Sequence, residues 1–311
     1  MPPRFRLVRL CTLSISVGFL LLPALHAADG QRIKMKDHPW TLKTGAAYTH
    51  SFDADVDNNS SDLSTDRLDL RTGLTYSPGP YMAVGVSLGY SHTDYDLHRL
   101  GGLDDPWDAI HRVSFGLPVR LALSREWALL ATPSVRWTLQ EDADADEAVT
   151  VGGMLGLLYR VSDQLRIGPG AVVGSQLEDD TRVIPIPLID WQVSDKWRLR
   201  TGRAGEMATA SGVNVTYQAA ERTRVLLALG YEKRRMRLDD DGVAPDGVGQ
   251  DRSMPLTLGV THSLTSLASL AITGGMRFGG QLRLEDEDGH RIVEEDYDEQ
   301  PFVGISLRLK F

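Results

Sequence analysis

The segment that decides the fold is Pro301-Phe302-Val303-Gly304-Ile305-Ser306-Leu307-Arg308-Leu309-Lys310-Phe311. Side chains of a β-strand alternate between two faces with a period of two residues. One face of this strand is therefore apolar and the other is small, polar or cationic. The apolar face carries Val303, Ile305, Leu307, Leu309 and Phe311, and the other carries Gly304, Ser306, Arg308 and Lys310. The pattern predicts a strand that separates a hydrophobic environment from a polar one.

The same alternation recurs along the chain. In residues 82–93, Val84, Val86 and Leu88 share one face, whereas Gly85 and Ser87 share the other. No apolar run after residue 28 approaches the roughly 20 residues of a membrane-spanning helix, which excludes a helical membrane protein. Fourteen strands are predicted, at residues 40–50, 66–76, 82–93, 111–123, 127–139, 149–161, 165–175, 183–193, 196–203, 212–219, 223–236, 253–263, 267–282 and 301–311.

The connections between these segments alternate in length. Short ones carry turn residues, as in Ser77-Pro78-Gly79-Pro80, and longer acidic ones are expected near 51–65, 94–110, 140–148, 177–182, 204–211, 237–252 and 283–299. This pattern is typical of a transmembrane β-barrel. Lipid offers no hydrogen bonds, so the first strand must pair with the last. We therefore predict an all-β protein, a closed antiparallel transmembrane barrel. A soluble β-sandwich is the competing architecture.

The middle of the chain fits the pattern least well. Pro185 and Pro187 lie within the predicted strand 183–193, and proline cannot donate a hydrogen bond to a sheet. Either this strand is bulged or it faces a plug inside the barrel. If residues 183–219 contribute fewer strands, the barrel has twelve.

A chain that ends on an aromatic residue after this alternation resembles the closing strand of Gram-negative outer-membrane β-barrels. The resemblance implies that the barrel-assembly machinery of that membrane recognises Ile305, Leu307, Leu309 and Phe311. It also implies periplasmic short turns, extracellular acidic loops, and contact with outer-membrane lipid and lipopolysaccharide. Tryptophan and tyrosine near predicted strand ends fit the membrane interfaces. Fourteen-strand relatives include monomeric porins and transporters of hydrophobic compounds; residues 29–38 are too short for the plug of the latter. Monomer and trimer remain open.

The other end of the chain predicts export. Residues 1–28 read as a cleaved secretory signal peptide, with Arg4, Arg6 and Arg9 before an apolar run, and residues 29–311 as a single barrel domain. Cleavage removes the only cysteine, so disulfides and thiolate sites are not expected. It leaves 30 basic residues against 42 acidic ones, a net charge of −12. That balance argues against nucleic acid as a partner.

Arginine dominates the face predicted to line the lumen. Few acids share that face, chiefly Asp69, Asp190 and Glu232. Unpaired buried charge is costly, so such arginines predict a water-filled, porin-like pore that favours small anionic solutes. The alternative is a structural or adhesive envelope barrel whose lumen is filled by paired side chains. The predicted lining residues are Arg71, Arg112, Arg120, Arg136, Arg160, Arg198, Arg200, Arg277 and Arg308.

Two further kinds of site find weak support in the sequence. Asp286, Asp288 and Glu295 approximate a calcium loop, although Leu284 would occupy its first ligand position. We therefore predict no metal or other cofactor. An outer-membrane lipid hydrolase is a third functional alternative, for which His92 with Asp94 is the best catalytic pair. Ser91 and His92 face opposite sides of their strand and cannot form a dyad, and we predict no catalytic residues.

Overall fold

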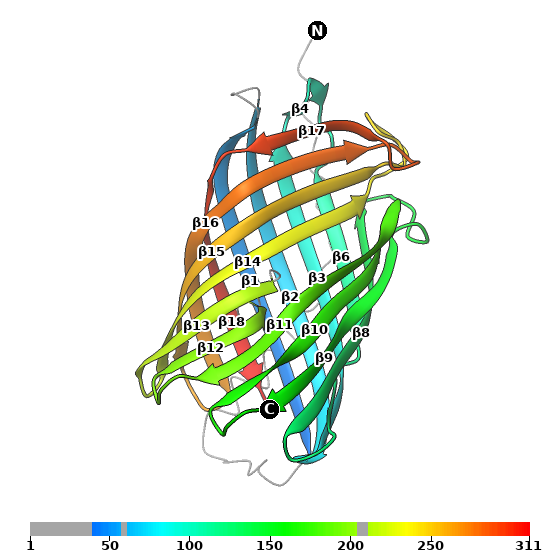
Figure 1. Ribbon diagram of the computed structural model, residues 1–311. Helices are drawn as coiled ribbons and strands as arrows, with labels where there is room; N and C mark the ends of the chain where they lie inside the picture. Colours follow the sequence, from blue (N-terminus) through cyan, green and yellow to red (C-terminus); the bar gives the residue numbers. More distant parts are fainter. Residues whose placement is uncertain (1–38, 57–60, 204–210) are drawn as a thin grey trace. The chain divides into compact units, whose positions relative to one another are not determined.

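The computed structural model describes residues 39–56, 61–203 and 211–311. They form a closed antiparallel β-barrel of fourteen strands (Figure 1), which confirms the predicted fold class and the larger strand count. None of these residues belongs to a helix long and apolar enough to cross a membrane. The predicted signal peptide, residues 1–28, and residues 29–38 lie outside the described part of the chain.

Each barrel strand pairs with its neighbours in sequence. β6 and β7 together make one barrel strand, because both pair with β3 and with β8. β17 and β18 likewise share the partners β16 and β1. A small hairpin, β4 (Arg99–Leu100) with β5 (Leu103–Asp104), lies in the connection from β3 to β6. The barrel strands are β1 (Trp40–Val56), β2 (Ser61–Gly79), β3 (Met82–Leu97), β6 (Ala109–Gly116) with β7 (Val119–Ala122), β8 (Trp127–Gln140), β9 (Val149–Arg160), β10 (Leu165–Gln176), β11 (Asp179–Gln192), β12 (Trp197–Arg203), β13 (Ser211–Ala220), β14 (Thr223–Arg237), β15 (Val248–Ser263), β16 (Ala268–Glu285), and β17 (Arg291–Tyr297) with β18 (Gln300–Lys310).

The first strand closes the barrel against the last. β1 pairs with β18 without interruption from Lys43 opposite Lys310 to Ser51 opposite Phe302. The amide of Phe311 donates to the carbonyl of Leu42 at 2.8 Å, and the amide of Leu42 donates back at 3.0 Å. This pairing satisfies the backbone groups that an open edge would leave without partners in lipid.

The two ends of the barrel differ. At the end that we call the turn end, two- to four-residue connections join the strands, and at the loop end the connections are generally longer. Three cross-strand aromatic pairs mark the turn end, with ring centroids 4.7–4.8 Å apart: Trp40–Tyr76, Trp127–Tyr159 and Trp197–Tyr217. Amphipathic rings favour the boundary between lipid and water. The wall above them exposes large apolar side chains, among them Leu68, Leu74, Val84, Val86, Leu88, Leu227, Leu229, Leu258 and Ile305.

Several strands continue further toward the loop end than the sequence predicted. β1 reaches Val56 and β2 begins at Ser61, so most of the connection expected at 51–65 is strand. The connection expected at 283–299 contains β17, which pairs with the end of β16. In the extension of β1, Asp53 and Asp55 alternate with Ala54 and Val56, whereas β17 carries acidic and apolar residues on both faces. The acidic runs therefore mask the alternation that would predict a strand.

The prolines of β11 are accommodated because the hydrogen-bond ladder between β11 and β12 is short, and not by a bulge or a plug. β11 pairs with β10 in continuous register from Trp191 to Arg182, but with β12 over only three residue pairs, Asp190–Gln192 opposite Arg198–Arg200. Backbone donors of a strand alternate between its two edges. The amide of Ile189 points toward β12, where it donates to Thr201 Oγ1 at 2.8 Å. Pro185 and Pro187 have the same parity, so their missing donors fall on the edge that lacks a ladder.

Candidate functional site: a filled loop end above an arginine-lined lumen

The loop end is narrower than the rest of the barrel because β14 crosses to β8. Arg237 of β14 pairs in parallel with Leu139 of β8, which bypasses the five strands from β9 to β13. β12 and β13 stop well short of the loop end (Figure 1). At that level β14–β17 and β1, β2, β3, β6 and β8 therefore surround a smaller space.

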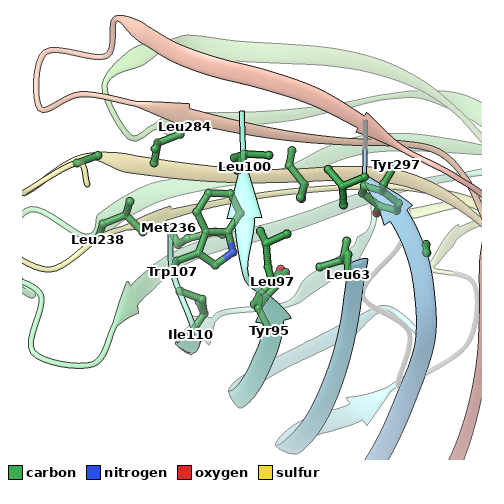
Figure 2. Close-up of a cluster of buried hydrophobic side chains, with 14 residues drawn as sticks. Leu63, Tyr95, Leu97, Leu100, Trp107, Ile110, Met236, Leu238, Leu284 and Tyr297 are labelled. Carbon is green, nitrogen blue, oxygen red and sulfur yellow. The ribbon is translucent and has the colours of Figure 1, made fainter. Parts of the chain in front are cut away.

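A hydrophobic core fills this space, and we call it the loop-end core. Its side chains converge from opposite walls (Figure 2), and Leu100, Met236, Leu282 and Leu284 are completely buried. None of its members comes from β9–β13. Its residues are Ala54, Val56, Leu63, Tyr95, Leu97, Leu100, Trp107, Ile110, Met236, Leu238, Ala244, Leu282, Leu284 and Tyr297.

A layer of buried charge lies beside the core. Glu232 accepts hydrogen bonds from Arg67 Nη1 at 3.2 Å and Arg234 Nε at 3.0 Å. Arg234 Nη1 donates to the hydroxyl of Tyr95 at 3.2 Å, and that hydroxyl donates to Asp251 Oδ2 at 3.0 Å. This network joins β2, β14, β3 and β15 across the interior. Charges buried in this way are tolerated because they are paired and hydrogen-bonded.

Tyr297 of β17 completes the layer by donating to Asp251 Oδ1 at 3.1 Å. Its ring lies against Gly280, the residue opposite it on β16, where an added Cβ would overlap the ring. Gly280 therefore leaves the space that the tyrosine needs to reach Asp251.

The β10–β11 connection packs against the far side of β14. Arg235 donates to the carbonyl of Leu177 at 2.7 and 3.1 Å, and its guanidinium also pairs with Glu285. Arg237 pairs with Glu178, and Lys233 donates to Gln176 at 3.0 Å. These side-chain contacts hold β10 and β11 to β14 where β12 and β13 no longer lie between them.

Strand register places the nine predicted lining arginines on the inner face. Arg67 defines that face by its contact with Glu232 across the interior, and directly paired residues of neighbouring strands share a face. Ser91 opposite Arg112, Arg112 opposite Thr138 and Ser114 opposite Arg136 carry the assignment from strand to strand. The remaining pairs are Gly45 with Arg71 and Arg308, Ala83 with Arg120, Arg166 with Arg160, Asp190 with Arg200, Gln192 with Arg198, and Gln300 with Arg277.

These arginines do not share one environment. Arg277 is buried and lies 5.8 Å from the ring centroid of Phe302, a cation–π contact. Arg71, Arg112, Arg198 and Arg308 are half-buried. Arg198 makes a two-pronged contact with Asp190, at 2.7 and 2.8 Å. In contrast, Arg120, Arg136, Arg160 and Arg200 are exposed although their register faces them inward.

The residues proposed from sequence for assembly lie on the opposite face. Ile305 is exposed on the outer wall, Leu307 is half-buried, and Leu309 is 9% exposed beside β1 and β16. Phe311 extends the pairing with β1 through its backbone. Recognition by the assembly machinery stays a prediction.

The calcium candidates are not brought together. Asp286 Oδ1 accepts the backbone amides of Asp288 and His290, at 3.1 and 2.7 Å, as in a tight turn. Glu295 instead lies on β17 opposite Leu282. Within residues 39–56, 61–203 and 211–311, no three His, Asp or Glu side chains are grouped so as to hold a metal ion.

The pair that was considered for catalysis, His92 and Asp94, lies on the outer wall. His92 Nε2 is 2.9 Å from Asp94 Oδ1, and the ring of His111 lies 4.7 Å from that of His92. Ser91 faces the interior, as alternation required. The pair therefore has no serine beside it on its own strand face.

Sequence reasoning missed the loop-end core. Its signal was present as apolar residues inside the segments taken as acidic loops, such as Leu97, Leu100, Trp107, Leu238 and Leu284. They follow no single period, because they come from strand ends, a two-residue strand and irregular connections. The pairing of β14 with β8 encloses the space in which they meet.

Comparisons with known proteins agree with this architecture. A family model described as a domain of unknown function (DUF6268) matches residues 53–310. The COG4313 outer membrane channel from Pseudomonas putida F1 superposes with a TM-score of 0.50 at 9% identity, over 91% of this chain and 99% of that one. That likeness shows a shared fold.

Two other solved structures match less closely. The P. putida toluene transporter TodX has a TM-score of 0.41 at 10% identity, covering 88% of this chain and 93% of its own. The translocator domain of the autotransporter NalP from Neisseria meningitidis has 0.39 at 10%, covering 94% of each chain. A search of curated proteins found no match.

Proposed function

We propose that this chain, which belongs to the family described as a domain of unknown function (DUF6268), is an outer-membrane channel for passive passage of small anionic solutes. The observation that carries the proposal is the exposure of inward-facing arginines in the part of the barrel below the loop-end core. Arg136 and Arg200 lie within strands and face the lumen, yet both are exposed. An inward side chain of a closed barrel is exposed only if water reaches the lumen.

The charge of this lumen favours anions. On the inner face below the core, Asp190 is paired with Arg198, and Arg160 lies 4.0 Å from Asp163 of the adjoining turn. Arg120, Arg136 and Arg200 lie on the same face. Rings of arginine or lysine select anions in pores, because each fixed positive charge attracts the permeating ion and repels cations. The turn end then serves as the periplasmic opening, in keeping with the resemblance to Gram-negative outer-membrane barrels.

The loop-end core acts as the gate of this channel. It occupies the space within the ring from β14 to β8, and conduction along the barrel axis requires its side chains to part. The conformation described here is thus a closed state. Such a gate resembles the hydrophobic constrictions that close other channels by excluding water.

Reversal potentials in planar bilayers test the anion preference. Under a KCl gradient, the open channel should show the potential expected for chloride selectivity. Replacing Arg120 and Arg136 together by Glu should shift that potential toward the cation value. Arg125→Glu, in the turn between β7 and β8, is the matched control and should leave it unchanged. An unchanged reversal potential in the double variant would refute the proposal.

A second candidate function is a structural or adhesive envelope barrel. The filled loop end is the specific observation in its favour, because paired charges and buried apolar residues occupy that part of the interior. Folded protein that never conducts, in any variant of the loop-end core, would support this candidate over the channel.

A further inference from the structure

The buried charged layer contains a small cavity whose walls are rich in hydrogen-bond donors. Its volume is about 10 Å³, and it is lined by Arg67, Ser91, Thr93, Tyr95, Ile110, Arg112, Thr138 and Arg234. Three of these side chains are guanidiniums, four carry hydroxyls and one is apolar. No carboxylate is among them. The space corresponds to one water-sized particle.

The donors around the cavity are not all used. Arg234 is 5% exposed, and its Nη2 atom has no hydrogen-bond partner within the described residues. Its other nitrogens are occupied by Glu232 and Tyr95. A buried guanidinium nitrogen without an acceptor is costly, so a bound acceptor in the cavity would remove that cost.

Thr138 adds a second available donor. Arg112 Nε donates to Thr138 Oγ1 at 3.1 Å, which leaves the hydroxyl hydrogen of the threonine free to point elsewhere. The cavity is thus bordered by a charged and a neutral donor from different strands, β14 and β8.

The charge of the cavity lining also favours an anion over a water molecule. Arg67, Arg112 and Arg234 line the cavity, whereas the buried carboxylates of Asp69, Glu232 and Asp251 are not among its lining residues. Three guanidiniums and no carboxylate therefore border the cavity, which makes its lining positive. A monovalent anion is favoured in such a lining, because buried charges are tolerated when they are paired.

From this cavity, its unused donor and the charge of its lining, we infer that the protein holds a single halide-sized monovalent anion between Arg112, Thr138 and Arg234. Chloride occupies a volume close to the ~30 Å³ share of one water molecule, so small movements of the flexible arginine side chains accommodate it. Charge-assisted hydrogen bonds from guanidiniums are among the stronger ones in proteins. The site stabilises the closed loop end. The inference does not depend on whether solutes pass through the barrel.

Bromide provides the direct test, because it replaces chloride and scatters X-rays anomalously. Crystals of the full-length folded barrel grown in NaBr should show an anomalous peak within hydrogen-bond distance of Arg234 Nη2. Thr138→Val keeps the shape of the side chain but removes its donor, and should weaken the peak several-fold. Water or empty space in the cavity at saturating bromide would overturn the inference.

A solution measurement separates a built site from general salt effects. The unfolding temperature of the folded barrel should rise with chloride when gluconate replaces it at constant ionic strength. Arg112→Gln should lose at least half of that rise. Arg125→Gln, in the turn between β7 and β8 and away from the cavity, is the control and should keep all of it. An equal chloride response in both variants would refute the site.

Discussion

Asp239 is a carboxylate whose pKa is raised by its place in the fold. It lies in the connection between β14 and β15, accepts a hydrogen bond from Gln140 at 2.9 Å and is partly buried. Burial raises the pKa of Asp239 above its ordinary value; a hydrogen bond from the Asp241 backbone opposes the shift, and repulsion from Asp108, Asp241 and Asp240 adds to it. The folded protein thus binds this proton more tightly than the unfolded chain.

The sign of the resulting pH dependence follows from linkage. Folding favours the protonated form of Asp239. The contribution of Asp239 to the stability of the folded state is therefore greatest at acid pH and falls as pH rises through the raised pKa. Asp239→Asn should therefore unfold at a higher temperature than wild type at pH 7, and the difference should shrink toward pH 4. Thermal melts in detergent at the two pH values measure it. A variant less stable at pH 7 would contradict this account.

At the scale of residues, the alternation of side chains predicts which residues share the inner face of a strand. It does not predict which residues they contact there. The period of two in 111–123, 127–139 and 301–311 is enough to place Arg112, Arg136 and Arg308 on one side of their strands. Whether an inward arginine is paired depends on residues far away in the chain. Arg67 meets Glu232, 165 positions later, and local pattern carries no information about that contact.

At the scale of elements, the β10–β11 connection depends on β14 for support. Arg235 is 9% exposed and joins the carbonyl of Leu177 to Glu285. Removing one partner of a buried ion pair typically costs about 3–5 kcal/mol, because the other charge stays buried. Arg235→Gln should therefore loosen the hairpin tip.

Limited proteolysis with a glutamate-specific protease measures this loosening. Cleavage after Glu178 should be at least tenfold faster in Arg235→Gln than in wild type. Arg252→Gln, on the neighbouring strand β15, provides a control that should cleave at the wild-type rate. Equal resistance of all three proteins would show that the contacts with β14 do not hold the hairpin.

The sequence predicts some of the strands more accurately than others. All fourteen barrel strands were expected, and strands such as 165–175 and 223–236 agree with the structure within a few residues. The strand ends beyond the membrane-facing part were missed, because β17 and the end of β1 mix acidic and apolar residues. The prolines of β11 were recognised as a disturbance, but only the register shows that they face the edge toward β12.

At the scale of the whole molecule, the barrel combines two interiors. Below the loop-end core, water reaches inward arginines, and at the loop end apolar side chains and paired charges fill the ring from β14 to β8. The wall around both exposes apolar residues such as Leu258 and Ile305, as lipid requires. We therefore regard the molecule as a conduit with one closed end.

Trp107 offers the most direct test of this view. It is 2% exposed, packs edge-on against Tyr95 with centroids 6.2 Å apart, and lies in a connection rather than in the barrel wall. Truncating a buried tryptophan typically costs about 3–5 kcal/mol, and 1.4 kcal/mol is a tenfold change in an equilibrium. Trp107→Ala should thus shift the closed state toward an open one without removing a strand.

Single-channel recording of wild type and Trp107→Ala in planar bilayers decides the matter. The wild-type protein should be closed for most of the recording, and Trp107→Ala should be open at least ten times as often, with chloride preferred over potassium. Leu258→Ala, on the outer wall, should behave as wild type. A wild-type protein that conducts steadily, or a Trp107→Ala protein that stays as closed as wild type, would contradict the account.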